Sequence, residues 1–199
     1  MTGPGEPGWT RAGSAGPGSA GPGSAGAGSP TGQSLPGWLK QALRLPNRLY
    51  ERGWGRLLGH RFLQLTHVGR RSGRTFHTVL EVVRYDPGTG EATVLSGFGP
   101  RADWLRNVQA GGRVQVSFGV GPRAAAYRVV PVEEAERVLA DYERRNRLVR
   151  PVLRRVLSGL VGWDYDGSPT ARRRLVEQLP VVAFRPAFVD TPDGAARNM

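Results

Sequence analysis

The chain has 199 residues and no cysteine, which excludes a disulfide framework and a thiolate metal site. Histidine is also scarce: the three present lie within residues 60–77, so we expect no metal site. No apolar run is long enough to span a bilayer, and the N-terminus lacks the basic start and apolar core of a secretory signal. We therefore expect a cytoplasmic protein.

Lysine is nearly absent, since Lys40 is the only lysine among 28 basic residues, and the net charge is +12. Nine arginines lie within residues 144–174. No helix-turn-helix, zinc-finger or aromatic strand motif accompanies them, so we expect no nucleic-acid partner. The amphipathic stretch 147–161 is best interpreted as a core-packing helix with a solvated arginine face. Peripheral contact with the inner face of the cell membrane stays open.

Composition divides the chain into three parts. Residues 1–33 are rich in Gly, Ala, Ser and Pro and have almost nothing to bury, which predicts a disordered tail. Residues 34–186 carry the apolar patterns of one folded domain. Residues 187–199 are expected to be a flexible C-terminal tail.

Hydrophobic periodicity and breaker residues predict alternating groups of helices and strands. Helices are expected over 37–45, 47–58, 104–110 with Asp103 as cap, 132–146, 147–161 and 169–179 with Ser168 as cap and Pro169 first. Strands are expected over 62–66, 76–85, 92–95, 114–118, 124–130 and 181–184. Tight turns between strands favour an α+β fold: a small antiparallel β-barrel of about six strands with helices packed outside.

A turn at residues 67–75 concentrates the chemistry that binds anions. Gly69 and Gly73 allow a tight turn that points several N–H groups into one concavity. Arg70, Arg71 and Ser72 add cations and a hydroxyl donor, which suits a phosphate. A plain hairpin turn with solvated arginines is at least as compatible with this segment taken alone.

No Gly-x-Ser-x-Gly elbow and no complete dinucleotide fingerprint occurs, so any chemistry would come from a cofactor. Trp104 and Asn107 lie one helical turn apart beside free N–H groups, although core packing is favoured for Trp104. Ser96 and Gly97 would let a flat ring approach the backbone. Glu81 stands in an apolar run, where pairing with an arginine is favoured over a role in proton transfer beside a bound ring.

Three segments together resemble the deazaflavin-dependent nitroreductase family of actinobacteria. They are Leu65-Thr66-His67-Val68-Gly69-Arg70-Arg71-Ser72-Gly73, then Ser96-Gly97-Phe98-Gly99, then Asp103-Trp104-Leu105-Arg106-Asn107-Val108-Gln109-Ala110. The similarity runs from about residue 47 to residue 186. It implies a split β-barrel that binds coenzyme F420, a deazaflavin with a phosphate and an oligoglutamate tail; FMN remains an alternative cofactor.

The resemblance assigns roles to residues by position. The phosphate would be held by Arg70, Arg71, Ser72 and Gly73. The rest of the cofactor would be lined by Phe76, Thr78, Val79, Leu80, Leu95, Ser96, Gly97, Trp104 and Asn107. No catalytic side chain is implied, because the hydride comes from the cofactor.

Departures from the family pattern concern the substrate side. Gly97 stands where well-known members carry a lysine, and Glu81 where they carry a tyrosine near the substrate. Tyr142, Trp163 and Tyr165 are the aromatic residues of the C-terminal part, and we place Glu81 and Tyr165 near the substrate. The expected activity is reduction of a small electron-poor acceptor, a quinone, nitro or enone compound. The alternative is a non-catalytic flavin-binding or membrane-surface module, and a homodimer stays open.

Overall fold

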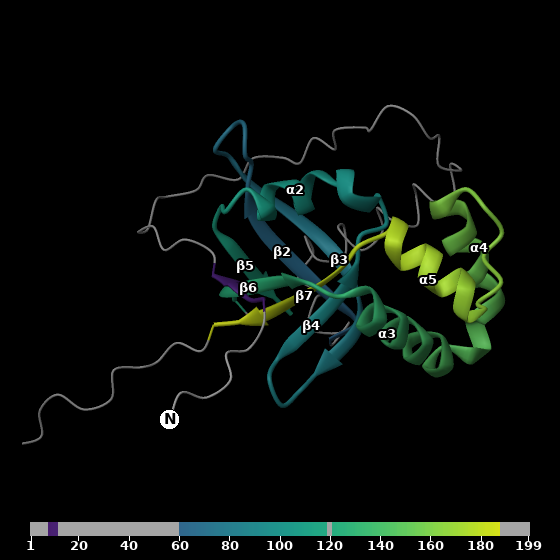
Figure 1. Cartoon of the computed structure of the whole chain (residues 1–199). Helices are drawn as coiled ribbons and strands as arrows, with labels where there is room; N and C mark the ends of the chain where they lie inside the picture. The colour runs from purple at the N-terminus through teal and green to yellow at the C-terminus, as the bar shows by residue number, and fades with distance from the viewer. Residues whose placement is uncertain (1–7, 12–59, 119–120, 188–199) are drawn as a thin grey trace, which may run out of the picture.

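The computed structural model describes residues 8–11, 60–118 and 121–187 (Figure 1). Its strands are β1 (Thr10–Arg11), β2 (Phe62–Val68), β3 (Thr75–Asp86), β4 (Glu91–Leu95), β5 (Val114–Ser117), β6 (Arg123–Val129) and β7 (Val181–Pro186). Its α-helices are α2 (Asp103–Gln109), α3 (Val132–Arg145), α4 (Arg150–Val161) and α5 (Pro169–Gln178), with 3-10 turns η2 (Gly99–Arg101) and η3 (Arg147–Val149). The expected elements from residue 60 onward are confirmed within a few residues at their ends.

Six antiparallel strands close into a barrel in the order β6-β5-β2-β3-β4-β7, and β7 pairs again with β6. Strand β6 makes the closure because its first residues pair with β5 and the remainder, from Ala125, pairs with β7. The α+β class with a small antiparallel barrel is therefore confirmed. The expected helices over 37–45 and 47–58 and the tail over 188–199 lie outside the described residues.

Alternation along β2 and β3 sets which side chains face the barrel interior. Leu63 and Leu65 are fully buried, and they pair across the strands with Leu80 and Thr78. Paired residues share a face of a sheet, so Leu80 and Thr78 face inward with them. Val79 lies between these two and faces outward. The interior is completed by side chains from α2, β4 and β7.

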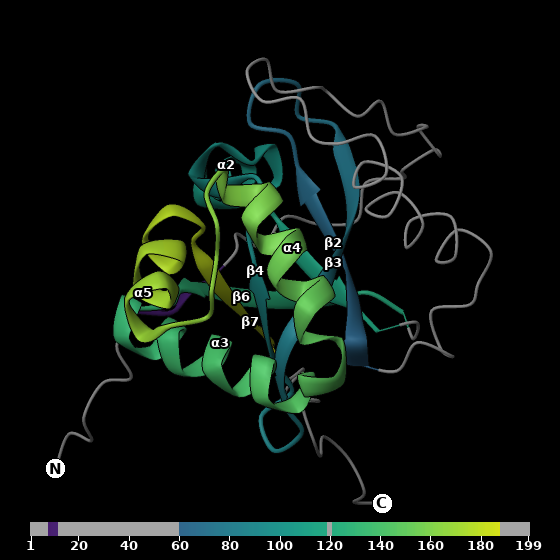
Figure 2. The same ribbon diagram turned by 90° about the vertical axis from the view of Figure 1, so that its right-hand side faces the viewer.

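Helices α3, α4 and α5 gather on one side of the barrel, and α2 lies at the end that carries the β2–β3 turn (Figures 1 and 2). A second apolar cluster fills the space under the three helices. The stretch 147–161 is shorter as a helix than expected, because η3 precedes α4. Leu148 and Val149 lie in η3 and Val152 in the first turn of α4. They are 90%, 50% and 63% exposed, so the expected packing of this stretch against the core is wrong for these three residues.

Residues 8–11 differ from the expectation of a disordered tail over 1–33. They contain β1, which pairs with Ala126 and Tyr127 of β6. The Trp9 ring lies under two guanidinium groups, at 4.4 Å from Arg185 and 5.3 Å from Arg128. A single aromatic residue thus attaches this short segment to the barrel, although its surroundings in sequence have nothing to bury. The rest of the predicted tail lies outside the described residues.

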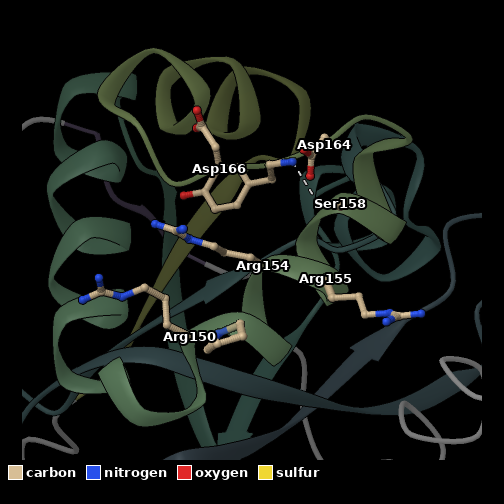
Figure 3. Close-up of a pocket in the computed structure, with 8 residues that line it drawn as sticks. Arg150, Arg154, Arg155, Ser158, Asp164 and Asp166 are labelled. Atoms are coloured by element: carbon tan, nitrogen blue, oxygen red, sulfur yellow. Dashed lines mark hydrogen bonds between the residues drawn. The ribbon is translucent and has the colours of Figure 1, made fainter.

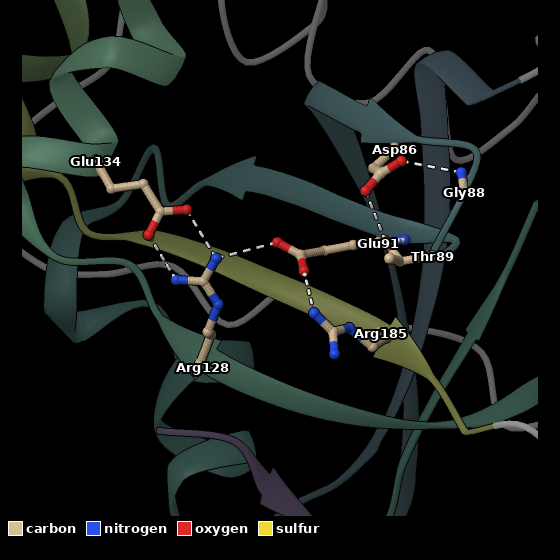
Figure 4. Close-up of polar contacts among 7 residues, drawn as sticks. All are labelled: Asp86, Gly88, Thr89, Glu91, Arg128, Glu134 and Arg185. Atoms are coloured by element: carbon tan, nitrogen blue, oxygen red, sulfur yellow. Dashed lines mark hydrogen bonds and ion pairs between the residues drawn. The ribbon is translucent and has the colours of Figure 1, made fainter. Parts of the chain in front are cut away.

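The arginines over Trp9 are held by carboxylates on the barrel surface (Figure 4). Arg128 pairs with Glu134 at 2.7 Å and with Glu91 at 3.1 Å, and Arg185 pairs with the other oxygen of Glu91 at 3.1 Å. The network joins β4, β6, β7 and the first turn of α3. Half-buried pairs in a shared network hold their geometry better than isolated surface pairs.

Candidate functional site

The turn between β2 and β3 is shaped by internal hydrogen bonds. The Gly69 N–H donates to the Arg74 carbonyl, the Gly73 N–H to the Gly69 carbonyl, and the Arg74 N–H to Ser72 Oγ. A side chain at position 69 would come within 2.6 Å of the Phe76 ring, so only glycine fits there. The expectation that free N–H groups line a concavity is therefore wrong for these three donors, which bond within the turn.

Arg70 links the turn to α2. Its backbone N–H and its Nη1 donate to Asn107 Oδ1 at 3.1 and 2.8 Å, and its guanidinium also contacts Asp103 Oδ1 at 3.1 Å. The structure thus brings together two predicted site residues, Arg70 and Asn107, that are 37 positions apart. The expected cap role of Asp103 is wrong: Ala102 is the N-cap of α2 without a side-chain bond, because the Asp103 carboxylate faces Arg70 instead.

His67 continues this link into the barrel wall. Its Nδ1 lies 3.2 Å from Asn107 Nδ2, and its Nε2 lies 3.4 Å from Thr78 Oγ1. Burial lowers the pKa of His67 from 6.5 to about 4, with a smaller contribution in the same direction from His77 and an opposing one from Asp103. The imidazole is therefore neutral at physiological pH. Sequence reasoning missed this role, because no local pattern places His67 against a helix 40 residues later.

The remaining side chains of the turn point to solvent. Arg71, Ser72 and Arg74 are exposed. Within residues 60–118 and 121–187, neither Arg71 nor Arg74 forms an ion pair. Two unpaired cations and a hydroxyl beside a half-buried Arg70 form a donor set that suits a phosphate. The chemistry of the residues present therefore fits the phosphate of a deazaflavin.

The residues of β3 assigned to the cofactor do not share one face. Thr78 and Leu80 face the barrel interior with Leu65 and Leu63, whereas Val79 faces outward. Phe76 packs parallel to the His67 ring with centroids 5.9 Å apart. One ligand cannot contact all of these side chains from one side of the sheet. Their assignment as cofactor-lining residues stays a prediction.

The segment after β4 forms a turn that is closed by hydrogen bonding between Ser96 and Gly99. The Ser96 side chain is fully buried, and its hydroxyl donates to the Gly99 carbonyl at 2.8 Å. Leu95 packs into the cluster beneath the helices, and a Cβ at Gly97 would lie 3.5 Å from the side chain of Leu160 in α4. Gly97 therefore lies next to Leu160 of α4, at the end of β4.

Trp104 is a core residue. It is 6% exposed and lies with its ring centroid 6.2 Å from that of Phe184 in β7. Asn107, one turn further along α2, is equally buried but turns its amide to the β2–β3 turn. The two residues therefore separate in role: Trp104 anchors α2, and Asn107 contacts Arg70.

The two residues placed near the substrate have different environments. Glu81 is exposed on the outer face of β3, where it accepts a 2.7 Å hydrogen bond from the Tyr142 hydroxyl and lies 3.6 Å from Arg61. Burial first, and Glu81 second, raise the pKa of Tyr142. The arginine partner favoured from the sequence is present as Arg61.

Tyr165 is only 1% exposed, and its hydroxyl donates to Glu143 at 2.6 Å. Burial raises the pKa of Tyr165. The other oxygen of Glu143 accepts from Arg172 Nε at 2.8 Å. Sequence reasoning missed Glu143, a buried carboxylate of α3 whose partners lie in the loop before α5 and on α5.

A hollow of about 540 Å³ lies between α4 and the loop before α5 (Figure 3). Arg150, Arg154 and Arg155 line it together with Asp164 and Asp166. The guanidinium groups of Arg150 and Arg155 point away from each other in Figure 3, so the three cations do not converge on one anion. None of the predicted phosphate-binding residues borders this hollow.

Antiparallel closure, helices outside the barrel and an arginine-bearing turn at one end describe a small α+β barrel. The sequence profile of the F420H(2)-dependent quinone reductase family matches residues 42–152, which is more than half of the chain. The chain belongs to this family. It is therefore a deazaflavin-dependent oxidoreductase whose cofactor is coenzyme F420.

Solved structures with some similarity include an F420-H2 dependent reductase, FDR-A, at 17% identity and a TM-score of 0.37 over 63% of this chain and 94% of that one. A protein of unknown function from Agrobacterium tumefaciens has 14% identity and a TM-score of 0.40, over 82% and 59%. An FMN-binding protein from Nostoc punctiforme, related to pyridoxamine 5'-phosphate oxidase, has 15% identity and a TM-score of 0.34, over 78% and 83%. No curated protein matches this chain.

Proposed function

We propose that this protein reduces a small electron-poor acceptor, with a quinone first and nitro or enone compounds as alternatives. Bound F420H2 supplies the hydride. The observation that carries the proposal is the Arg70–Asn107 link, which joins the predicted phosphate turn to the predicted site helix. The family's description favours the quinone among the acceptors.

The turn is proposed to hold the cofactor phosphate through side chains. Arg71 and Ser72 are exposed donors, and Arg70 presents the edge of a guanidinium that Asp103 and Asn107 keep in place. Gly73 has a φ of 64°, a left-handed conformation that a bulkier residue would adopt only with strain, and the space beside it is open. A phosphate approaching from solvent would thus meet donors without a steric obstacle from this residue.

The outer face of β3 is proposed to face the acceptor. Glu81 lies two residues from Val79 on that face, and its carboxylate holds the Tyr142 hydroxyl. Addition of a hydride to a quinone also requires one proton, and we assign its uptake from solvent and its transfer to the hydrogen-bonded pair of the Glu81 carboxylate and the Tyr142 hydroxyl. Tyr165 is buried with its hydroxyl engaged, so we carry only Glu81 forward as a residue near the substrate.

Titration with F420, followed by its fluorescence, tests the cofactor site. The Arg70→Ala/Arg71→Ala variant should bind about a hundredfold more weakly, since two charge-assisted contacts are lost. Arg155→Ala, an exposed arginine on α4, is the matched control and should bind like the wild type. Absence of binding by the wild type at micromolar protein, or equal binding by the double variant, would contradict the proposal. Turnover of quinone, nitro and enone compounds then ranks the acceptors.

We also propose that the start of α4 contacts anionic membrane surfaces. Leu148, Val149 and Val152 are exposed, and the exposed arginines Arg147 and Arg155 lie on the same stretch. Apolar side chains beside cations match a surface with acidic headgroups. Among the described helices, none is long and apolar enough to cross a membrane.

Co-sedimentation with vesicles tests this contact. Binding should increase with the fraction of anionic lipid and fall for Leu148→Ser/Val152→Ser, whereas F420 affinity should not change. Binding that does not depend on anionic lipid, or that survives the double substitution, would contradict it.

A further inference from the structure

Buried polar side chains connect the β2–β3 turn to the barrel wall in a defined order. His67 and Asn107 are 3% and 6% exposed, so their hydrogen bonds must be made within the protein. Asn107 faces two groups of Arg70, the backbone N–H and Nη1, both within 3.1 Å of one amide atom. Both groups of Arg70 can only donate. The amide atom that faces them must therefore be the oxygen.

This orientation determines the protonation of His67. The Asn107 amide nitrogen is left to face His67 Nδ1 at 3.2 Å, and because that nitrogen donates, Nδ1 must accept. The neutral ring therefore carries its proton on Nε2, which lies 3.4 Å from Thr78 Oγ1. Donation thus runs from Arg70 to Asn107, from Asn107 to His67, and from His67 to Thr78.

We propose that His67 is a positioning residue that fixes the amide of Asn107 with its oxygen toward Arg70, and so keeps the turn in the shape that binds the cofactor phosphate. A flipped amide would place its NH₂ group against two donors of Arg70 and its oxygen against His67 Nδ1. Neither contact can be a hydrogen bond while Nδ1 is unprotonated. The inference rests on the proposed binding of the F420 phosphate at this turn.

The first test needs no cofactor. Nitrogen NMR of the histidine rings in the full-length protein should show His67 protonated on Nε2, with Nδ1 free of hydrogen, at neutral pH. In Asn107→Asp the carboxylate can only accept, so His67 Nδ1 must donate. Its pKa should then rise from about 4 to above 6.5. A wild-type ring protonated on Nδ1, or an unchanged pKa in Asn107→Asp, would overturn the proposal.

The second test is F420 affinity by fluorescence titration. His67→Leu removes the acceptor and should weaken binding about tenfold. His67→Asn presents an oxygen near the position of Nδ1 and should stay within about threefold of the wild type. In the Asn107→Asp background, His67→Leu should weaken binding less than it does in the wild type, because a carboxylate has two equivalent oxygens and no orientation to fix. The titration is run above the raised pKa of His67, so that a neutral ring is removed in both backgrounds.

The outcomes separate this proposal from the cofactor site itself. If the wild type does not bind F420, the phosphate proposal fails, while the NMR experiment still decides the orientation of Asn107. If His67→Leu binds like the wild type, or its effect persists in Asn107→Asp, the positioning role is overturned. Circular dichroism checks that each variant folds. Should His67→Leu not fold, the wild-type ring protonation and the pKa in Asn107→Asp decide.

Discussion

Two buried polar networks of this protein differ in whether they lead to exposed side chains at the surface. At the β2–β3 turn, neutral His67 and Asn107 connect to Arg70, beyond which Arg71 and Arg74 are exposed without carboxylate partners among the described residues. Beneath the helices, Glu143 is 3% exposed and receives one hydrogen bond on each oxygen, from Tyr165 and Arg172. The first network is open toward solvent, and the second is satisfied internally.

The difference indicates where ligand binding should be sought. The buried carboxylate of Glu143 joins α3 to α5 and has no donor to offer an anionic ligand. Exposed cations on a turn that Arg70 and Asn107 hold in place offer such donors. The hollow beside Tyr165 is not lined by any of the predicted phosphate-binding residues, so we expect ligand binding at the turn instead.

Removing the carboxylate of the internal network should have the largest effect on stability. Glu143→Ala leaves Arg172 and the Tyr165 hydroxyl without a partner and should lower the free energy of unfolding by about 4 kcal/mol. F420 affinity should not change. Urea unfolding measures the loss, with Glu177→Ala, an exposed partner of Arg173, as the control of small effect. A matching drop in F420 affinity would erase the distinction between the networks.

Because the His67 ring of the first network is neutral, the free energy of unfolding should depend on pH. The pKa of His67 is about 4 in the folded protein and 6.5 ordinarily, so as pH falls the unfolded chain binds the proton first. Stability is fully present above pH 6.5 and lost progressively toward pH 4, by about 3 kcal/mol. Unfolding at several pH values measures this slope, and His67→Asn should flatten it. Equal slopes in both proteins would show that His67 is not buried as a neutral ring.

Substituting an exposed arginine should affect F420 affinity at the turn but not near the helices. Arg71→Ala removes one exposed cation of the turn and should weaken F420 binding about tenfold. Arg173→Ala, whose guanidinium pairs with three carboxylates near the helices, should leave affinity unchanged. Raising salt should narrow the difference between wild type and Arg71→Ala. Equal affinities at low salt would remove the turn from the site.

Trp9 lies outside both networks, so its substitution should change the free energy of unfolding without changing F420 affinity. Trp9→Ala removes two guanidinium contacts and should lower the free energy of unfolding by about 1 kcal/mol. Trp9→Phe keeps a ring under Arg128 and Arg185 and should lose less. Thermal unfolding measures both. A change in F420 affinity in either variant would connect the N-terminal segment to the turn.

Local sequence patterns predicted correctly those features that residues close in sequence form with one another. Ser168 accepts from the Ala171 N–H as a helix cap, as its position before Pro169 predicts. The antiparallel pairing of β2 with β3 follows from the Gly69–Gly73 turn and the alternating residues beside it. The residues that form such a cap or hairpin are close in sequence, so they can interact without contacts from distant parts of the chain.

Partners distant in sequence explain what the patterns missed. Asp103 has the residue type and position of a cap, but an arginine 33 residues earlier binds its carboxylate. Trp9 stands in a segment without other apolar residues, and its partners lie on β6 and β7. For the candidate site, the composition of the turn predicted Arg70, and helical spacing predicted Asn107 independently of it. The contact of His67 with Asn107 could be recognised only from the tertiary structure.

The closure of the barrel by β7 has a consequence for synthesis of the protein. Strand β7 pairs with β4 and β6 at once, so until residues 181–186 leave the ribosome one edge of β4 and one edge of β6 stay unpaired, although β3 and β5 already pair with their other edges. Unpaired strand edges are templates for association with other chains. The nascent chain should therefore be most prone to aggregation just before its final strand emerges, and closure over such a long sequence separation should be the slow step of folding.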